Sequence, residues 1–316
     1  CSSDLVAAAS GGVWKTTNAG TTFKPVFEDA GSSSIGCVTI APSNPLIVWV
    51  GTGENNSQRS VGWGDGVYRS VDGGRHFSNM GLKASEHIGR IVVHPTNPNI
   101  VWVAAQGPLW APGGDRGVYK TTDGGTTWKQ VLKVDEWTGA NEVHLDPNDP
   151  NTLYASTYQR HRKVWTLVDG GPGSGIYKSS DGGETWTKLT RGLPGGDMGR
   201  IGLTVPSNER NVVLATVEAS PDARGTYRTD DGGANWSKLN GNLATSPQYY
   251  QELYADPSVR GRVYMIDTFL QTSDDGGRTW RRAGETNKHV DNHVVWIDPD
   301  DSRHLLVGCD GGLYET

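Results

Sequence analysis

The chain has 316 residues, of which 35% are hydrophobic and 20% charged, and its formal net charge at pH 7 is −6. This length can hold one large or two ordinary β domains, and the negative charge argues against a surface that binds nucleic acid or an anionic membrane. No apolar run is long enough to span a bilayer, whereas the 43 glycines and 16 prolines favour short strands joined by tight turns.

Two kinds of segment alternate along the chain and predict its strands. The first kind reads VTIAPSNPLIVWVGTG at residues 38–53 and returns at 91–107, 143–157, 203–218, 253–268 and 295–312. The second reads WKTTNAGTTF at 14–23 and returns at 68–77, 119–128, 177–186, 227–236 and 271–280. Both kinds are rich in Val, Ile, Tyr and Trp and are bounded by Pro, Asn, Asp and Gly, which is typical of strands. No stretch shows helical periodicity with capping residues.

Each repeat holds four strand signals, here called A, B, C and D. In one unit they are RIVVH (90–94), IVWVAA (100–105), GVYKTT (117–122) and TTWKQVL (126–132). Five complete units begin near residues 36, 88, 141, 199 and 250, with partial units at 5–27 and 293–316. Four-stranded antiparallel sheets at such a period are the blades of a β-propeller, so we predict an all-β propeller with about seven blades.

A short turn between strands C and D carries the most regular motif. Its Asp or Asn recurs at intervals of 44 to 58 residues, as Asn18, Asp72, Asp123, Asp181, Asp231 and Asp275. Glycine supplies backbone angles that other residues resist, and Asp accepts hydrogen bonds from the amides of the turn. We therefore interpret the motif as structural; a sugar or calcium site on each turn is the functional alternative.

The turn motif resembles a known repeat. The pattern S/T-x-D-x-G-x-T-W is similar to the Asp-box, or bacterial neuraminidase repeat, and five of the six copies keep its Asp. GVYKTTDGGTTW together with HPTNPNIVWVA resembles the sortilin-type and xyloglucanase-type propellers, often labelled glycosyl hydrolase-like. The resemblance covers essentially the whole chain. It implies a single propeller domain over 1–316 and an exported protein in the periplasm, at the cell surface or secreted. Because the sequence lacks an initiator Met and stops in mid-repeat at GGLYET, we expect a fragment of a larger chain, truncated at both ends. Sialidases, xyloglucanases, photosystem assembly factors and sorting receptors share the repeat, so it leaves function open.

Strand direction separates two faces of the predicted propeller. The A–B and C–D turns share one face, called here the turn face. The B–C and D–A connections share the other, called here the loop face, and they are long and irregular: 53–66, 83–89, 106–117, 133–140 and 158–175. Irregular loops on a rigid scaffold commonly carry binding or catalytic residues, so we expect the site on the loop face.

The first residues of the A strands are expected to ring the mouth of the central channel. They are Cys37, Arg90, Glu142, Arg200, Glu252 and His293. Two interpretations stay open: a set of mutually paired charges around a wet channel, or a clamp for a polar or anionic ligand.

Further candidates lie in the loops around this mouth. The charged ones are Glu54, Arg59, Glu86, His87 and Arg160, and the aromatic ones are Trp63, Trp110, Trp137 and Trp165. Exposed indole rings are platforms for sugar rings, while buried loop anchors are the structural alternative.

Catalysis, if present, is expected to use carboxylates. A glycoside hydrolase needs two carboxyl groups about 5 to 10 Å apart, for which Glu54, Glu252 and Asp291 are the candidates. His289, Asp291 and His293 alternate along an extended segment and could converge on a metal, but one short motif predicts no metal site, and no cofactor is expected.

The sequence thus leaves three functions. The first is a propeller that recognises a glycan, peptide or protein at the channel mouth. The second is a xyloglucanase-like or sialidase-like hydrolase using the same face. The third is a structural lobe of a larger exported protein.

Overall fold

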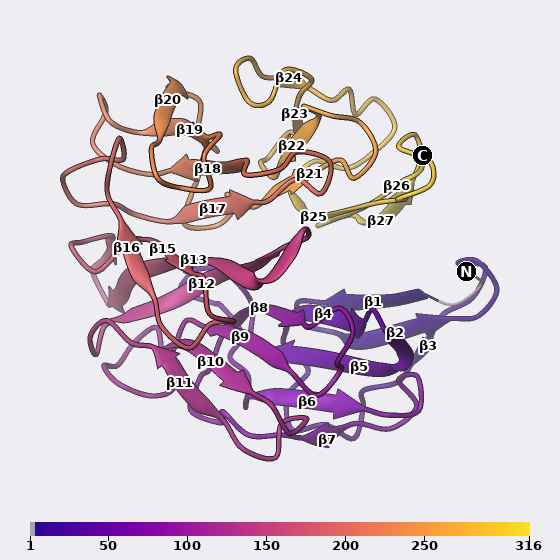
Figure 1. Ribbon diagram of the computed structural model, residues 1–316. Helices are drawn as coiled ribbons and strands as arrows, with labels where there is room; N and C mark the ends of the chain where they lie inside the picture. Colours follow the sequence, from indigo (N-terminus) through magenta and orange to yellow (C-terminus); the bar gives the residue numbers. More distant parts are fainter. Residues whose placement is uncertain (1–3) are drawn as a thin grey trace.

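The computed structural model describes residues 4–316 as seven antiparallel sheets, which follow one another along the chain as the blades of a β-propeller (Figure 1). Blade 1 contains β1 (Asp4–Ala8), β2 (Gly12–Thr16) and β3 (Lys24–Pro25). Blade 2 contains β4 (Ile35–Ala41), β5 (Asn44–Thr52), β6 (Val67–Ser70) and β7 (Ser78–Asn79). Blade 3 contains β8 (Ile88–Val93), β9 (Val101–Ala105), β10 (Gly117–Thr121) and β11 (Lys129–Leu132).

The remaining blades continue the same order. Blade 4 contains β12 (Thr138–Asp146), β13 (Asp149–Lys163), β14 (Thr166–Asp169), β15 (Gly175–Ser179) and β16 (Thr187–Leu189). Blade 5 contains β17 (Ile201–Thr204), β18 (Val213–Val217), β19 (Gly225–Thr229) and β20 (Ser237–Asn240). Blade 6 contains β21 (Leu253–Ala255), β22 (Val263–Met265), β23 (Gln271–Ser273) and β24 (Arg281–Arg282), and blade 7 contains β25 (Asn292–Ile297), β26 (Leu305–Cys309) and β27 (Gly312–Glu315).

The predicted fold class is confirmed. Residues 4–316 contain no helix, and therefore none that is long and apolar enough to cross a membrane. Blades 2, 3, 5 and 6 have the four predicted strands in sequential order, and blades 1 and 7 have three. The first strands of neighbouring blades lie side by side around the centre, as β4 and β8 do, and Thr39 Oγ1 of β4 donates a hydrogen bond of 3.0 Å to the Ile91 carbonyl of β8.

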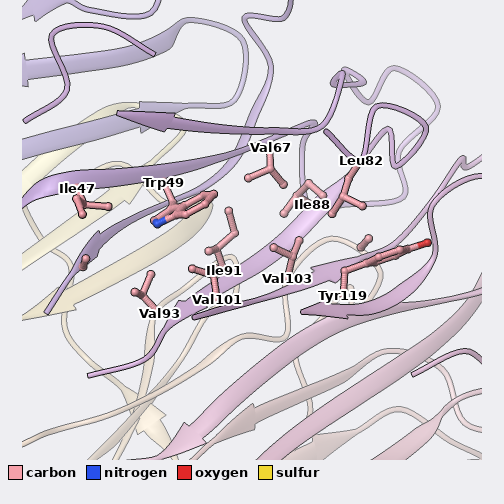
Figure 2. Close-up of a cluster of buried hydrophobic side chains, with 12 residues drawn as sticks. Ile47, Trp49, Val67, Leu82, Ile88, Ile91, Val93, Val101, Val103 and Tyr119 are labelled. Atoms are coloured by element: carbon pink, nitrogen blue, oxygen red, sulfur yellow. The ribbon is translucent and has the colours of Figure 1, made fainter. Parts of the chain in front are cut away.

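The hydrophobic core lies between neighbouring blades. Figure 2 shows the cluster between blades 2 and 3, in which Trp49 of β5 lies above Ile91 of β8 and Val103 of β9, all buried. Strand alternation explains the pattern, because successive side chains point to the two faces of a blade and each face meets a neighbour.

One segment expected to be a loop is partly a strand. Residues 158–175 were predicted to be irregular, but β13 runs through Lys163 and pairs with β14, with Lys163 opposite Thr166. Val164 and Trp165 form the two-residue turn at the tip of this hairpin. Such pairing follows from the β-branched and long side chains on both arms, which suit a half-buried ribbon.

The Asp-box turns brace the C–D hairpins through the side chains that the motif repeats. In blade 3, Thr121 Oγ1 donates to Asp123 Oδ1 (2.8 Å), which also accepts from the Thr127 amide (2.9 Å), and the Gly125 amide donates to Thr121 Oγ1 (2.9 Å). The turn glycines, for example Gly124 with φ of 72°, adopt the left-handed conformation. Trp128 then donates to the Met80 carbonyl of blade 2 (2.7 Å), so in blade 3 the motif ties the turn to the preceding blade.

Candidate functional site

A loop of blade 2 crosses the mouth of the channel. This crossing loop (residues 53–59) begins after β5, and Asn55 Nδ2 donates to Glu252 Oε1 of blade 6 at 3.0 Å. The Ser57 amide donates to the Gln248 carbonyl at 3.2 Å, and Arg160 Nη1 of blade 4 donates to the Asn56 carbonyl at 2.6 Å. The crossing loop therefore joins blades 2, 4 and 6 above the ring of A-strand residues.

One charged group of the ring lies between blades 3 and 4. Arg90 Nη1 lies 3.4 Å from Glu142 Oε2, and the same oxygen lies 2.6 Å from His144 Nε2. Glu142 is buried, while the Arg90 side chain is 30% exposed. Burial and the nearby Arg90 charge lower the pKa of His144, so its ring is neutral at pH 7 and Arg90 supplies the counter-charge.

A second charged group lies under the crossing loop. The Arg200 guanidinium forms an ion pair with Glu252, and Glu252 also accepts the hydrogen bond from Asn55. Gln106 of blade 3 donates to Asn55 Oδ1 and completes the connection. Burial is the main cause that raises the pKa of Glu252 to about 7, with a further rise from the charge of Glu142 and an opposing effect of Arg200.

The remaining ring residues and the H-x-D-x-H motif do not converge on one point. His293 Nε2 pairs with Asp310 (2.8 Å), His289 Nδ1 lies 2.7 Å from the Val290 carbonyl, and Asp291 Oδ1 accepts from the Tyr250 hydroxyl (2.5 Å). Burial raises the pKa of the Cys37 thiol to about 12, so it is protonated and unreactive. Within residues 4–316 no group of three His, Cys, Asp or Glu side chains could hold a metal ion.

The charged candidates near the start of the crossing loop have mainly internal partners. Glu54 Oε2 accepts from Asn56 Nδ2 at 2.9 Å. His87 is buried, its Nδ1 lies 3.0 Å from the Glu54 carbonyl, and burial lowers its pKa to about 3. Glu86 is half-buried with a φ of 54°, whereas Arg59 is exposed. Of these candidates, Arg59 is the most accessible to a ligand.

Three tryptophans on the loop face are exposed. The exposed fractions are 70% for Trp63, 44% for Trp110 and 76% for Trp165. Their loops are tied together by Arg162, whose Nε donates to the Ser57 carbonyl (2.6 Å) and whose amide donates to the Leu109 carbonyl (2.9 Å). Trp137, by contrast, is half-buried and packs on His161 with ring centroids 4.3 Å apart.

The sequence analysis missed two carboxyl groups on the loop face. Asp169 ends β14 and Glu218 follows β18, and both are half-buried at the junction of blades 4 and 5. The Tyr158 hydroxyl donates to Asp169, and the Arg200 amide donates to Glu218 Oε2 at 3.0 Å. The available signal was an acidic residue at the end of a B-strand segment, as in VLATVE, but a strand end alone does not reveal which side chains surround it.

The turn face has cavities of its own. One of 410 Å³ lies between the Asp-box turns of blades 4 and 5 and is lined by Lys178, Asp181, Leu189 and Asp231, among others. Oδ1 of both aspartates accepts hydrogen bonds from its own turn, and Lys178 donates to the Gly232 carbonyl (2.8 Å). These groups hold the two turns, so we place the candidate site on the loop face.

The fold and the loops define a β-propeller of the Asp-box type with its irregular loops gathered on one face. The family model described as Sortilin, neurotensin receptor 3 (Sortilin-Vps10) matches residues 65–224, and that of the BNR/Asp-box repeat matches residues 271–282. The first match covers half of the chain, which therefore belongs to the Sortilin-Vps10 family. The resemblance predicted from the repeats is confirmed.

A curated relative has an enzyme name. It is a probable oligoxyloglucan-reducing end-specific xyloglucanase of Neosartorya fischeri, 30% identical over 133 residues, which is 39% of this chain and 14% of the relative. The match thus spans a small part of that longer protein.

Solved structures share the fold. An ancestral GH74 enzyme superposes with a TM-score of 0.68 at 20% identity, over 96% of this chain and 41% of the enzyme. YCF48 from Cyanidioschyzon merolae gives 0.62 at 17% identity, over 99% of this chain and 91% of YCF48. YCF48 bound to D1 peptide gives 0.59 at 13% identity, over 98% and 88% of the two chains. These likenesses establish the propeller fold.

Proposed function

We propose that the loop face binds a neutral, extended glycan of the β-glucan class, such as xyloglucan. The observation that carries the proposal is the exposure of Trp63, Trp110 and Trp165 on loops that hydrogen bonds hold together. An indole ring in water is costly unless a partner covers it, and the apolar face of a sugar ring is a suitable partner for a flat aromatic surface. The name of the xyloglucanase relative supports the same ligand class.

In this proposal the charged residues at the channel mouth pair with one another and fix the position of the crossing loop. Arg90 with Glu142, and Arg200 with Glu252, compensate one another, so they leave little net charge for an anionic ligand. Glu252 also fixes the crossing loop through Asn55, which sets the position of the loop that carries Trp63. Among the charged candidates, Arg59 on the crossing loop is exposed and is placed to donate hydrogen bonds to glycan hydroxyls.

An extracytoplasmic location belongs to the same proposal. It is supported by the family membership and by the xyloglucanase name of the relative, because a large polysaccharide such as xyloglucan would be met outside the cell.

The test compares tryptophan variants for glycan binding. The protein is titrated in a calorimeter with xyloglucan oligosaccharides, with mannan oligosaccharides and with unrelated peptides. We expect the xyloglucan oligosaccharides to bind. Trp63→Ala and Trp165→Ala should each lower the affinity about fivefold, because one lost stacking contact is worth about 1 kcal/mol.

Trp296→Ala is the matched control, since Trp296 is 46% exposed but lies near the turn-face end of β25, where its ring packs edge-on against His304. A parental affinity in both loop variants would refute the tryptophan surface. Binding of peptides and of no glycan would replace the glycan by a peptide ligand.

A further inference from the structure

We propose that the surface between blades 7 and 1 binds a polypeptide segment of the chain's own repeat type, which adds a D strand to blade 7 and an A strand to blade 1. We call this ligand the closing segment. The inference concerns the association of polypeptides, and it does not depend on the glycan proposed above.

Two strand positions of the repeat are unfilled within residues 4–316. Blade 1 begins with β1, which is its B strand, and blade 7 finishes with β27, which is its C strand. The inner edge of β1 and the outer edge of β27 therefore have no strand beside them in this part of the chain. Because D of one blade is followed by A of the next, the two positions are consecutive, and one D–A segment can fill both. Unpaired strand edges bind added strands through their backbone groups.

The crossing loop shows that these two edges border the same part of the ring. It connects blade 2 to blade 6, since Asn55 Nδ2 donates to Glu252 Oε1 at 3.0 Å. Blade 7 shares a core cluster with blade 6, and blade 1 shares one with blade 2. The free faces of blades 7 and 1 therefore bound the space between blades 6 and 2, and both sheets are drawn on the right of Figure 1.

The face of blade 7 that points away from blade 6 is apolar. Val295 and Ile297 of β25 pack on blade 6. Strand alternation therefore turns Val294 and Trp296 to the other side, where both are exposed. Leu313 of β27 is exposed on that side as well, in cross-strand register with Val294 through β26. Apolar side chains gathered on one sheet face indicate a partner that covers them.

The opposite wall has a matching feature on blade 2. Thr39 Oγ1 of β4 donates to the Ile91 carbonyl of β8, so Ile40 points the other way, toward blade 1. Ile40 stands two residues before the proline that follows its A strand, as Val93 does in blade 3. Val93 is 4% exposed because blade 2 packs against it, whereas Ile40 is 42% exposed. The cover that Ile40 lacks within the described residues is an A strand in blade 1.

The free edge of β27 carries a charge that fits a D strand. Glu315 takes the place that Lys120 holds in blade 3, and the five other C strands have Lys, Arg or Thr there. The D-strand residue opposite this place is Ser or Thr in three blades and basic in the other three, as Lys24, Lys129 and Arg281. The Glu315 side chain is 64% exposed, with His304 as its partner at 2.8 Å. A basic residue on an added D strand would therefore form a cross-strand ion pair with Glu315.

Residues 279–297 of this chain have the chemistry that the closing segment needs. They run from the D strand of blade 6 to the A strand of blade 7, and Arg281 holds the D-strand position that would lie opposite Glu315. Their A part, NHVVWI at 292–297, has apolar side chains on both faces, one set for the wall of blade 7 and one for Ile40. A synthetic peptide of residues 279–297 is therefore a suitable probe.

The experiment measures binding of the labelled 279–297 peptide to the whole chain by fluorescence anisotropy. The parent should bind the peptide one to one, and a scrambled peptide of the same composition should not bind. Hydrogen exchange followed by mass spectrometry should locate the bound peptide. Exchange of the β27 amides should slow when the peptide binds, because the added strand pairs with their free edge, while exchange in β9 should stay unchanged.

Reversal of charge tests the strand register. Glu315→Arg should weaken peptide binding about fivefold, since an opposite-charge pair across strands is worth up to about 1 kcal/mol. A peptide carrying Arg281→Glu should regain the lost affinity on the Glu315→Arg protein. Asp300→Arg is the matched control, because it reverses an exposed charge in the A–B turn of the same blade, and it should bind the peptide like the parent.

The wall of blade 2 is tested separately. Ile40→Asp should weaken the 279–297 peptide at least about tenfold, because it places a carboxylate where the A strand of the peptide packs. Parental affinity in this variant would overturn the D–A segment as the ligand.

Two further outcomes would also overturn the proposal. One is the absence of peptide binding by a parent that unfolds cooperatively, or equal binding of the scrambled peptide. The other is a parent dimer, seen in sedimentation, that Trp296→Asp dissociates, since a second copy would then cover this face. None of these outcomes bears on glycan binding, which uses the loop face.

Discussion

At the scale of single residues, the ion pair between Arg200 and Glu252 holds the crossing loop in place, and its charge state depends on pH. Glu252 is buried with Arg200 as its partner and Asn55 as its link to the crossing loop. A buried pair of this kind adds little net stability, because desolvation offsets most of the attraction, but it fixes the positions of the groups that it joins. The crossing loop therefore depends on the state of one carboxyl group.

Glu252→Gln should reduce the change of stability with pH. The pKa of Glu252 is about 7 in the folded protein and 4.5 in the reference state. A raised pKa means that the folded protein binds the proton more tightly, so this group favours folding below about pH 4.5 and loses that contribution as pH rises to about 7. In urea titrations at pH 5 and pH 7.5, the parent should lose stability with rising pH, and Glu252→Gln should lose about 1 to 3 kcal/mol less.

Glu218 shifts in the same direction and remains in both proteins, so only the difference between them reports on Glu252. Identical pH dependence in the two proteins would contradict the burial of an ionisable Glu252.

At the scale of the element, the Asp-box turn is a local brace whose strength comes from the orientation of one carboxyl group. Asp123→Ala removes the acceptor for the Thr127 amide and for the Thr121 and Thr127 hydroxyls, and should lower the Tm by roughly 2 to 5 °C. Asp123→Asn is the control, because Asn18 already makes the equivalent bonds in blade 1, where its Oδ1 accepts from the Thr22 amide at 2.9 Å.

Thermal melts and glycan titrations of both variants check the interpretation. We expect Asp123→Asn to melt close to the parent and both variants to keep the parental affinity. A variant that melts like the parent but no longer binds glycan would show that the ligand binds at the Asp-box turns.

The same scale shows what could be predicted from the sequence. The turns, strands and blade order follow from residues close together in the chain, so the repeat predicts them. The hydrogen bond from Asn55 to Glu252, and that from Arg160 to the Asn56 carbonyl, join residues far apart in sequence. They depend on how long loops fold over the scaffold, which no local pattern encodes. The difference in burial between the exposed Trp63 and the half-buried Trp137 has the same cause. The presence of tryptophan in a loop does not show which ring packs against neighbouring side chains.

At the scale of the whole molecule, the blades form a row in which each blade packs mainly on its neighbours. Blade 3 has a core cluster on both faces, one shared with blade 2 and one with blade 4. Blade 7 shares a cluster with blade 6 through Val295 and Ile297, but its other face exposes Val294 at 44% and Trp296 at 46%. In such a row, stability is the sum of the blades and of the contacts between them, so an end blade with one covered face is the least stable.

In hydrogen exchange followed by mass spectrometry, the rate of amide exchange should therefore differ between the end blades and the inner blades. Amides of β26 in blade 7 and β2 in blade 1 should exchange through local opening, faster than amides of β9 and β13, which should exchange only on global unfolding. All four strands pair on both sides within their sheets, so the number of ladder hydrogen bonds does not explain the difference. Blade packing does, because blade 3 has a core cluster on both faces whereas blade 7 exposes Val294 and Trp296 on one face. Equal protection in all four strands would mean that the blades unfold as one unit, and the row of partly independent blades would be wrong.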